Sequence, residues 1–198
     1  NKRSDFESYP ANFRDDLAAL EDLGVHAVFA PQYEEMYPDD YRYRISESEL
    51  STVLEGEHRP GHFDGVLTVV MKLLNIAGAD RAYFGEKDWQ QLQLVKGLVD
   101  AFFLPVEIVA CPTGRAESGL ALSSRNRRLS AAGLEKAGRL NQILNTASTA
   151  EAAADALAAE GFVVEYVADR EGRRLAAVTL EDVRLIDNVE LFAGRESR

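Results

Sequence analysis

Residues 81–110, RAYFGEKDWQQLQLVKGLVDAFFLPVEIVA, decide the fold class of this chain. The run Arg81–Phe84 predicts a strand, the segment from Trp89 to Ala101 predicts a helix, and Val106–Ala110 predicts a second strand. This order is typical of a parallel sheet covered by helices, so the sequence predicts an α/β fold. Ligands bind such sheets at the carboxyl ends of the strands, which directs attention to the residues that follow Phe84.

The residues before this unit predict a long helix and some weaker elements. Gly65 to Ala77 carries a wide apolar stripe and is followed by Gly78, which predicts a buried helix that ends there. The weaker elements are a helix from Asn12 to Leu23, capped by Asn12 and ended by Gly24, a short strand at Ala27–Ala30 and an edge-like strand at Tyr41–Ile45.

The composition changes after Pro112. Thr113 to Arg128 is rich in Gly, Ser and Arg and has little periodicity, which is typical of a functional loop. We therefore expect a domain boundary near Pro112–Arg115, with residues 1–113 in the first domain and 114–198 in a small α+β second domain. Its predicted elements are helices at Ser130–Ala147 and Thr149–Glu160 and strands at Val163–Ala168, Leu175–Thr179 and Val183–Ile186.

The charge and composition of the chain disfavour several classes of protein. A net charge of −11 argues against a nucleic acid as the main partner, although a few cations gathered in one cleft can still bind a triphosphate. The sequence has no apolar run of the roughly 20 residues that a membrane span needs, and its start lacks the apolar core of a signal peptide. The single cysteine, Cys111, cannot form an intrachain disulfide. We expect a cytoplasmic protein without nucleic-acid or membrane partners.

The first candidate site lies between the predicted strand at 81–84 and the helix that follows it. Gly85 would let the backbone approach a ligand closely, and Lys87 is a mobile point charge suited to a polyphosphate. Asp88 could cap the helix or accept a hydrogen bond from a ribose hydroxyl, and Gln91 lies one helical turn further on. The alternative is a glycine-containing turn with a solvated lysine and an aspartate at the helix N-terminus.

The second candidate site is the loop Leu122–Arg128. The hydroxyls of Ser123 and Ser124 lie beside Arg125, whose guanidinium can bind phosphate oxygens in a bidentate manner. Three arginines in four positions are unusual in so acidic a chain. The alternative is a polar loop whose Ser130 caps the next helix.

Two further groups of residues could bind metal. His58 and His62 are spaced as in helical zinc sites, but Pro60 and Gly61 disfavour a continuous helix there, so loop residues that reach a cleft are the better interpretation. Asp15 lies near the start of the first predicted helix. It could bind Mg²⁺ together with substrate phosphates, or it could simply interact with the helix dipole.

Three segments together resemble the pantoate–β-alanine ligase (pantothenate synthetase) family. They are 55–63 (EGEHRPGHF), 84–91 (FGEKDWQQ) and 119–126 (GLALSSRN), and they occur in the family's order. The closing stretch Arg184–Asn188 is similar to the family's tail, and Tyr9-Pro10 with Asp15–Leu17 is similar to its early helix. The resemblance spans nearly the whole chain.

The resemblance implies both a fold and a reaction. Such enzymes have a Rossmann-like nucleotidyltransferase domain with a parallel sheet, followed by a smaller C-terminal domain that closes over ATP, and they are typically homodimers. They condense pantoate with β-alanine in two steps. The pantoate carboxylate attacks the α-phosphorus of Mg·ATP to give pantoyl adenylate and pyrophosphate, and the amine of β-alanine then attacks the adenylate and releases AMP.

The resemblance also assigns roles to individual residues. Gln91 would bind pantoate. The chain departs from the family at two positions: Gly114 stands where the family usually has valine, and Ala11 stands where it usually has arginine. The implied catalytic residues are Lys87, Ser123, Ser124 and Arg125. The implied ATP contacts are Gly85, Glu86, Lys87, Asp88, Gly114, Leu122, Ser123, Ser124 and Arg125, with Asp15 as a candidate ligand of Mg²⁺.

In the family, a His-x-Gly-His motif and an Asn-Pro-x-Gln-Phe strand end precede the segment that Asn1 begins. We therefore expect a protein that starts at Asn1 to fold and bind nucleotide weakly, but to form no detectable pantoyl adenylate. Two alternative functions are another adenylyl- or cytidylyltransferase of the same superfamily and a non-catalytic nucleotide-binding or dimerisation module.

Overall fold

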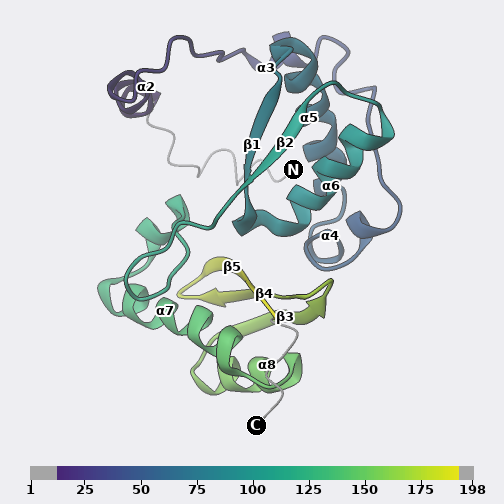
Figure 1. The fold of residues 1–198 in the computed structure, drawn as a ribbon. Helices are drawn as coiled ribbons and strands as arrows, with labels where there is room; N and C mark the ends of the chain where they lie inside the picture. The colour runs from purple at the N-terminus through teal and green to yellow at the C-terminus, as the bar shows by residue number, and fades with distance from the viewer. Residues whose placement is uncertain (1–12, 192–198) are drawn as a thin grey trace.

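The computed structural model describes residues 13–191 and contains two separate sheets (Figure 1). In the first sheet, β1 (Arg81–Gly85) pairs in parallel with β2 (Glu107–Cys111). The connection between them contains α6 (Trp89–Ala101), which packs against α5 (His62–Ala77). Apolar side chains of the two helices form one hydrophobic cluster, against which Phe84 of β1 and Ile108 of β2 pack.

The second sheet is antiparallel and has the order β3-β4-β5. Its strands are β3 (Val163–Arg170), β4 (Arg173–Leu180) and β5 (Val183–Glu190). The helices α7 (Ala131–Thr146) and α8 (Ala150–Ala159) cover one face and form the second hydrophobic cluster with it. The opposite side of this sheet is turned toward the first part of the chain, as Figure 1 shows. Side chains of β3 and β5 therefore meet the α4 and β1–α6 regions there.

The remaining elements of the described chain are short. Within residues 13–191, no helix has both the length and the apolar character needed to cross a bilayer. The short elements are α2 (Phe13–Asp22), α3 (Tyr33–Met36), η1 (Leu50–Thr52), α4 (Glu55–His58), η2 (Glu86–Asp88) and η3 (Ser124–Arg128).

The strongly periodic elements are confirmed. The helix predicted from Trp89 to Ala101 coincides with α6, and the one predicted from Gly65 begins three residues earlier, at His62. Gly78 ends α5 with a left-handed φ of 54°, which glycine adopts without strain. The Ser130 hydroxyl accepts a hydrogen bond from the Gly133 N–H at 2.9 Å, so the predicted cap of α7 is also confirmed.

The two weaker strand predictions are wrong. Residues 27–30 have no strand partner among the described residues, and the side chain of Phe29 is 60% exposed. The segment 41–45 turns instead, with Tyr41 at a φ of 57°. Its backbone amides donate to side chains and not to a neighbouring strand. The Tyr43 N–H donates to the Asp39 carboxylate, and the Ile45 N–H donates to the Thr68 hydroxyl. An apolar run or an alternating pattern makes a strand only where a neighbouring strand completes the hydrogen bonds. The predicted cap Asn12, and Ala11, lie outside the described residues.

A glycine-to-alanine change at position 114 is expected to stabilise the protein. The Gly114 φ lies outside the left-handed region, and a Cβ there would lie 3.5 Å from Cδ1 of Leu122, an ordinary contact. Alanine also restricts the unfolded chain, so Gly114→Ala should raise the free energy of unfolding by about 0.4–1 kcal/mol. Urea denaturation measures the change.

Gly119 provides the matched control for this prediction. Its φ of +87° strains any other residue, and an added Cβ would lie 3.2 Å from Oδ1 of Asn141. Gly119→Ala should therefore lower the free energy of unfolding by about 1 kcal/mol or more. A loss of stability from Gly114→Ala as large as that from Gly119→Ala would contradict the backbone geometry of these two glycines.

Candidate functional site

Lys87 lies in the turn at the carboxyl end of β1, where the fold class predicts a ligand site. Its side chain is 21% exposed, and its Nζ lies 4.0 Å from the carboxylate of Asp88. Asp88 precedes the first residue of α6, but its side chain makes no capping hydrogen bond. The interpretation of Asp88 as a helix cap is therefore wrong, because its carboxylate is turned toward the site and not toward the helix amides.

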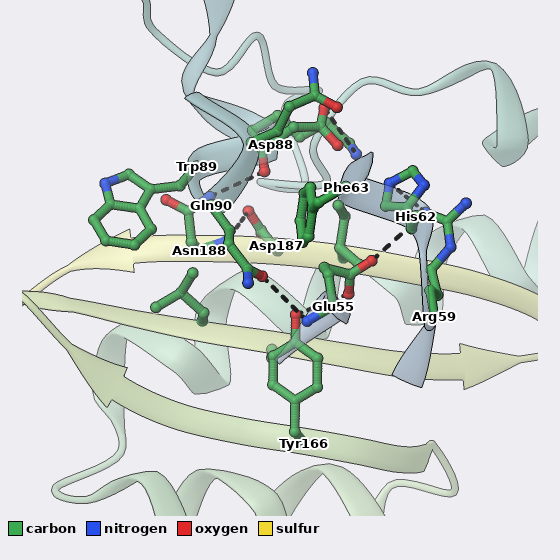
Figure 2. Close-up of a pocket in the computed structure, with 15 residues that line it drawn as sticks. Glu55, Arg59, His62, Phe63, Asp88, Trp89, Gln90, Tyr166, Asp187 and Asn188 are labelled. Carbon is green, nitrogen blue, oxygen red and sulfur yellow. Dashed lines mark hydrogen bonds and ion pairs between the residues drawn. The ribbon is translucent and has the colours of Figure 1, made fainter. Parts of the chain in front are cut away.

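Two cavities meet at Lys87. The first, shown in Figure 2, lies between α4, the start of α6 and the C-terminal sheet, and both Gln91 and His62 line it. The second contains Ser123 and Arg125 from the loop before α7. The structure thus brings together the two candidate sites that lie far apart in the sequence, with the lysine between them.

The Arg125 side chain is half-buried and makes no hydrogen bond or ion pair within residues 13–191. Arg127 and Arg128 are exposed, so of the three clustered arginines only Arg125 lines the cavity with Lys87. Two cationic side chains that share one cavity create a positive potential in an otherwise acidic protein. This arrangement can bind an anion such as a phosphate group.

Five of the other predicted ATP contacts line neither cavity at Lys87: Gly85, Glu86, Gly114, Leu122 and Ser124. Gly114 and Leu122 are neighbours, since the Leu122 N–H donates to the Gly114 carbonyl at 2.8 Å, and the Leu122 side chain is 60% exposed. Gly85 is exposed at the end of β1, and Ser124 is half-buried in η3.

Asp15, the candidate ligand of Mg²⁺, is placed elsewhere. It lies in α2, which stands apart from both sheets in Figure 1 and has no buried residue. Asp15 lines neither cavity at Lys87. Among the described residues, no three His, Cys, Asp or Glu side chains cluster so that they could hold a metal ion.

His62 lies in the first cavity as a neutral imidazole. Burial lowers its pKa, and the positive charge of Arg59 lowers it further, to about 4. The Arg59 guanidinium lies 3.1 Å from Nε2 of His62, and because a guanidinium only donates, Nε2 accepts. His58 ends α4 whereas His62 begins α5, so the two histidines do not share a helix.

A buried carboxylate lines this cavity and was not predicted as a site residue from the sequence. Glu55 is 7% exposed, and its two oxygens accept hydrogen bonds from Arg184 of β5 at 2.8 and 2.7 Å. The hydroxyl of Tyr166 from β3 donates to the same carboxylate at 2.8 Å. Burial alone would raise the pKa of Glu55, but the hydrogen bonds and the charge of Arg184 outweigh it and hold the pKa below 4.5.

An irregularity in β3 makes this cluster possible. The register of β3 against β4 shifts between Val164 and Tyr166, which leaves Glu165 as an additional residue. In a regular strand, Glu165 and Tyr166 would point to opposite faces. With the bulge, Glu165 reaches Arg184 at 2.8 Å while Tyr166 reaches Glu55.

Gln90 ties this cluster to the helix that carries Gln91. Its side chain is buried, accepts from the Glu55 N–H at 3.1 Å, and donates to the carbonyls of Leu50 and Val53 at 2.7 and 2.8 Å. The loop before α4 is therefore fixed to the first turn of α6.

The last part of β5 contributes a second unpredicted pair of buried polar residues, Asp187 and Asn188. Asp187 accepts two hydrogen bonds from Arg115, and Asn188 donates to the main chain at Lys87. A signal for them was present in the sequence, because the two polar side chains directly follow the apolar residues of a predicted core strand, and buried polar groups need partners.

The sequence comparisons agree with one another. Residues 1–190 match the model of the pantoate-beta-alanine ligase family. The pantothenate synthetase of Bdellovibrio bacteriovorus is 52% identical over 191 residues, which are 96% of this chain and 76% of that protein. The pantothenate synthetase of Coxiella burnetii is 49% identical over 189 residues, which are 96% of this chain and 73% of that protein.

Solved structures show the same fold. The pantoate-beta-alanine ligase of Francisella tularensis, complexed with beta-gamma ATP and β-alanine, superimposes with a TM-score of 0.90 and 39% identity, covering 98% of this chain and 75% of that one. The pantothenate synthetase of Thermus thermophilus gives a TM-score of 0.88 and 39% identity, covering 97% and 79%. The predicted Rossmann-like part followed by a small α+β part is thereby confirmed. The chain belongs to the pantoate–β-alanine ligase family.

Proposed function

We propose that this chain takes part in the reaction of its family, the ATP-dependent condensation of pantoate with β-alanine through a pantoyl adenylate. The observation that carries the proposal is the position of Lys87, which lines one cavity with Gln91 and another with Ser123 and Arg125. The Francisella relative, complexed with beta-gamma ATP and β-alanine, supports ATP and β-alanine as substrates of this chain.

Each cavity suits one part of the substrates. Lys87 and Arg125 would bind the phosphates of ATP, with Ser123 and Ser124 as additional donors. Gly114 and Leu122 would contact the nucleotide at the edge of the same loop, and Gly85, Glu86 and Asp88 would contact it from the turn after β1. Gln91 would hold pantoate through its amide, which can both donate and accept.

The first chemical step needs charge stabilisation more than a nucleophile from the protein. The pantoate carboxylate forms a bond to the α-phosphorus, and the bond from this phosphorus to the pyrophosphate oxygen breaks. Negative charge builds on the leaving pyrophosphate, and the cations Lys87 and Arg125 would stabilise it there. In the second step the amine of β-alanine attacks the acyl carbon, loses a proton and displaces AMP. Holding the reactants together accounts for much of the rate in such a reaction.

The remaining features of the proposal concern organisation. Residues 1–113 would form the nucleotide-binding domain and residues 114–198 the smaller domain, in keeping with the separate sheets and core clusters. The enzyme would be a cytoplasmic homodimer. Mg²⁺ would enter with the phosphates of ATP, and Asp15 stays a predicted ligand. Because Asp15 lines neither cavity at Lys87, no step is assigned to it.

Pyrophosphate release tests the proposed reaction. The assay uses protein in which a His-x-Gly-His segment precedes Asn1, with ATP and Mg²⁺ present. Release should require pantoate and reach a typical enzyme rate of about 1 s⁻¹ or more. Adding β-alanine should convert the adenylate to pantothenate and AMP. If pyrophosphate release did not depend on pantoate but required another acceptor, the alternative of a different nucleotidyltransferase would be favoured.

A further inference from the structure

A side chain from the C-terminal sheet holds the turn that carries Lys87. Nδ2 of Asn188 in β5 donates to the main-chain carbonyl of Glu86 at 2.9 Å and to that of Lys87 at 3.1 Å. Asn188 is only 3% exposed, so water competes little for these bonds. The two carbonyls belong to the peptide groups on either side of the Lys87 Cα atom. The contacts therefore fix the backbone from which the lysine side chain projects.

The orientation of the Asn188 amide is fixed as well. Its Oδ1 accepts from Nη1 of Arg173, and a guanidinium can only donate, so the NH₂ group must face the two carbonyls. Arg173 also lies 3.2 Å from the carboxylate of Glu86, and Glu86 is thus held through both its side chain and its main chain.

The preceding residue of β5 holds the other loop of the candidate site. The Asp187 carboxylate accepts from Arg115 at 2.8 and 2.9 Å, and Arg115 donates to the Gly119 carbonyl at 3.0 Å. The backbones of Arg115 and Ala121 also form an isolated antiparallel β-bridge. Ala121 directly precedes the segment that contains Ser123 and Arg125. Two adjacent residues of one strand therefore contact both loops that line the cavity at Lys87.

We propose that Asn188 is a positioning residue for Lys87. By holding the peptide groups on both sides of Lys87, Asn188 positions the ammonium group beside Ser123 and Arg125. The polyphosphate of the nucleotide would bind there. This inference rests on the proposed role of Lys87 in ATP binding. Positioning matters there because a misplacement of about 1 Å can cost on the order of 10²-fold in rate.

A double-mutant cycle on ATP affinity tests the proposal without requiring turnover. Trp89 is the only tryptophan, directly follows the turn and is 7% exposed, so its fluorescence can report ATP binding. With Lys87 present, Asn188→Ala should weaken ATP affinity about tenfold, since two buried hydrogen bonds are lost. In the Lys87→Ala background the same change should weaken affinity less than twofold, because the group that Asn188 positions is gone.

Two further variants make the outcomes separable. Asn188→Asp keeps the size of the side chain and the acceptor for Arg173 but loses both N–H donors. It should therefore weaken ATP affinity as Asn188→Ala does. If the alanine variant fails to fold, the affinity of Asn188→Asp tests the proposal in its place. Asn75 is an exposed asparagine in α5 whose side chain makes no hydrogen bond within residues 13–191, and Asn75→Ala should leave the affinity unchanged.

Equal losses from Asn188→Ala with and without Lys87, or unchanged affinity in Asn188→Asp, would overturn the positioning role and leave the proposed function standing. Unchanged affinity in Lys87→Ala itself would overturn both the role of Lys87 and the inference built on it.

Discussion

Lys87→Ala is expected to lower the rate of pantoyl adenylate formation by about 10²–10³-fold, or about 3–4 kcal/mol of transition-state stabilisation. The reason is that Lys87 lines both cavities and would face the phosphates whose charge changes during the reaction. Its only ion pair in the described structure is a 4.0 Å contact with Asp88, so its removal should leave the fold intact. The measurement is pantoate-dependent pyrophosphate release, in protein with a His-x-Gly-His segment ahead of Asn1.

Lys96 in the same helix α6 provides the matched control. It lines neither cavity at Lys87 and makes no ion pair within residues 13–191, so Lys96→Ala should retain the rate of the unaltered enzyme. A rate change below about threefold for Lys87→Ala would show that Lys87 does not stabilise the transition state. An equal loss in the two variants would show instead that the change acts through the stability of α6.

The local sequence pattern was sufficient to predict those helices whose burial follows from the spacing of their own apolar residues. Apolar spacing and flanking glycines predicted α5 and α6, because burial of one helix face follows from the spacing itself. The false strands were predicted from a short apolar run at 27–30 and from alternation at 41–45. A strand, however, depends on a partner that the local sequence does not reveal, and none pairs with them among the described residues.

The same distinction applies to the site. Lys87 and Arg125 were predicted because each lies in a short segment of recognisable chemistry. Glu55 was missed, since its burial depends on Arg184 and Tyr166, which are 129 and 111 residues away along the chain. A glutamate followed by Gly-Glu-His gives no local sign that it will be buried. Its role emerges only when β3 and β5 are placed against α4.

Glu55→Ala is expected to cause the largest loss of stability, about 3–5 kcal/mol, because it leaves part of a buried ion-pair network without its counter-charge. Arg184 would retain Glu165 at 2.8 Å, which places the expectation toward the lower end of the range. The measurement is urea denaturation followed by circular dichroism and by Trp89 fluorescence. Glu57, an exposed glutamate in the same short helix, is the control, and Glu57→Ala should change the free energy of unfolding by less than about 0.5 kcal/mol.

The dependence of stability on pH should separate Glu55 from its neighbour His62. The folded pKa of Glu55 lies below its ordinary value of 4.5, so its stabilising contribution is present above pH 4.5 and is lost as the pH falls through the folded pKa. The pKa of His62 is also lowered, from 6.5 to about 4, so the unfolded chain takes up a proton first and stability falls between these pH values. The variant His62→Gln can still accept a hydrogen bond from Arg59, and it should remove the pH dependence of stability between pH 6.5 and 4. The variant Glu55→Ala should remove the pH dependence of stability below pH 4.5. If Glu55→Ala and the unaltered protein lose stability in parallel below pH 4.5, the Glu55 carboxylate does not hold the C-terminal sheet against α4.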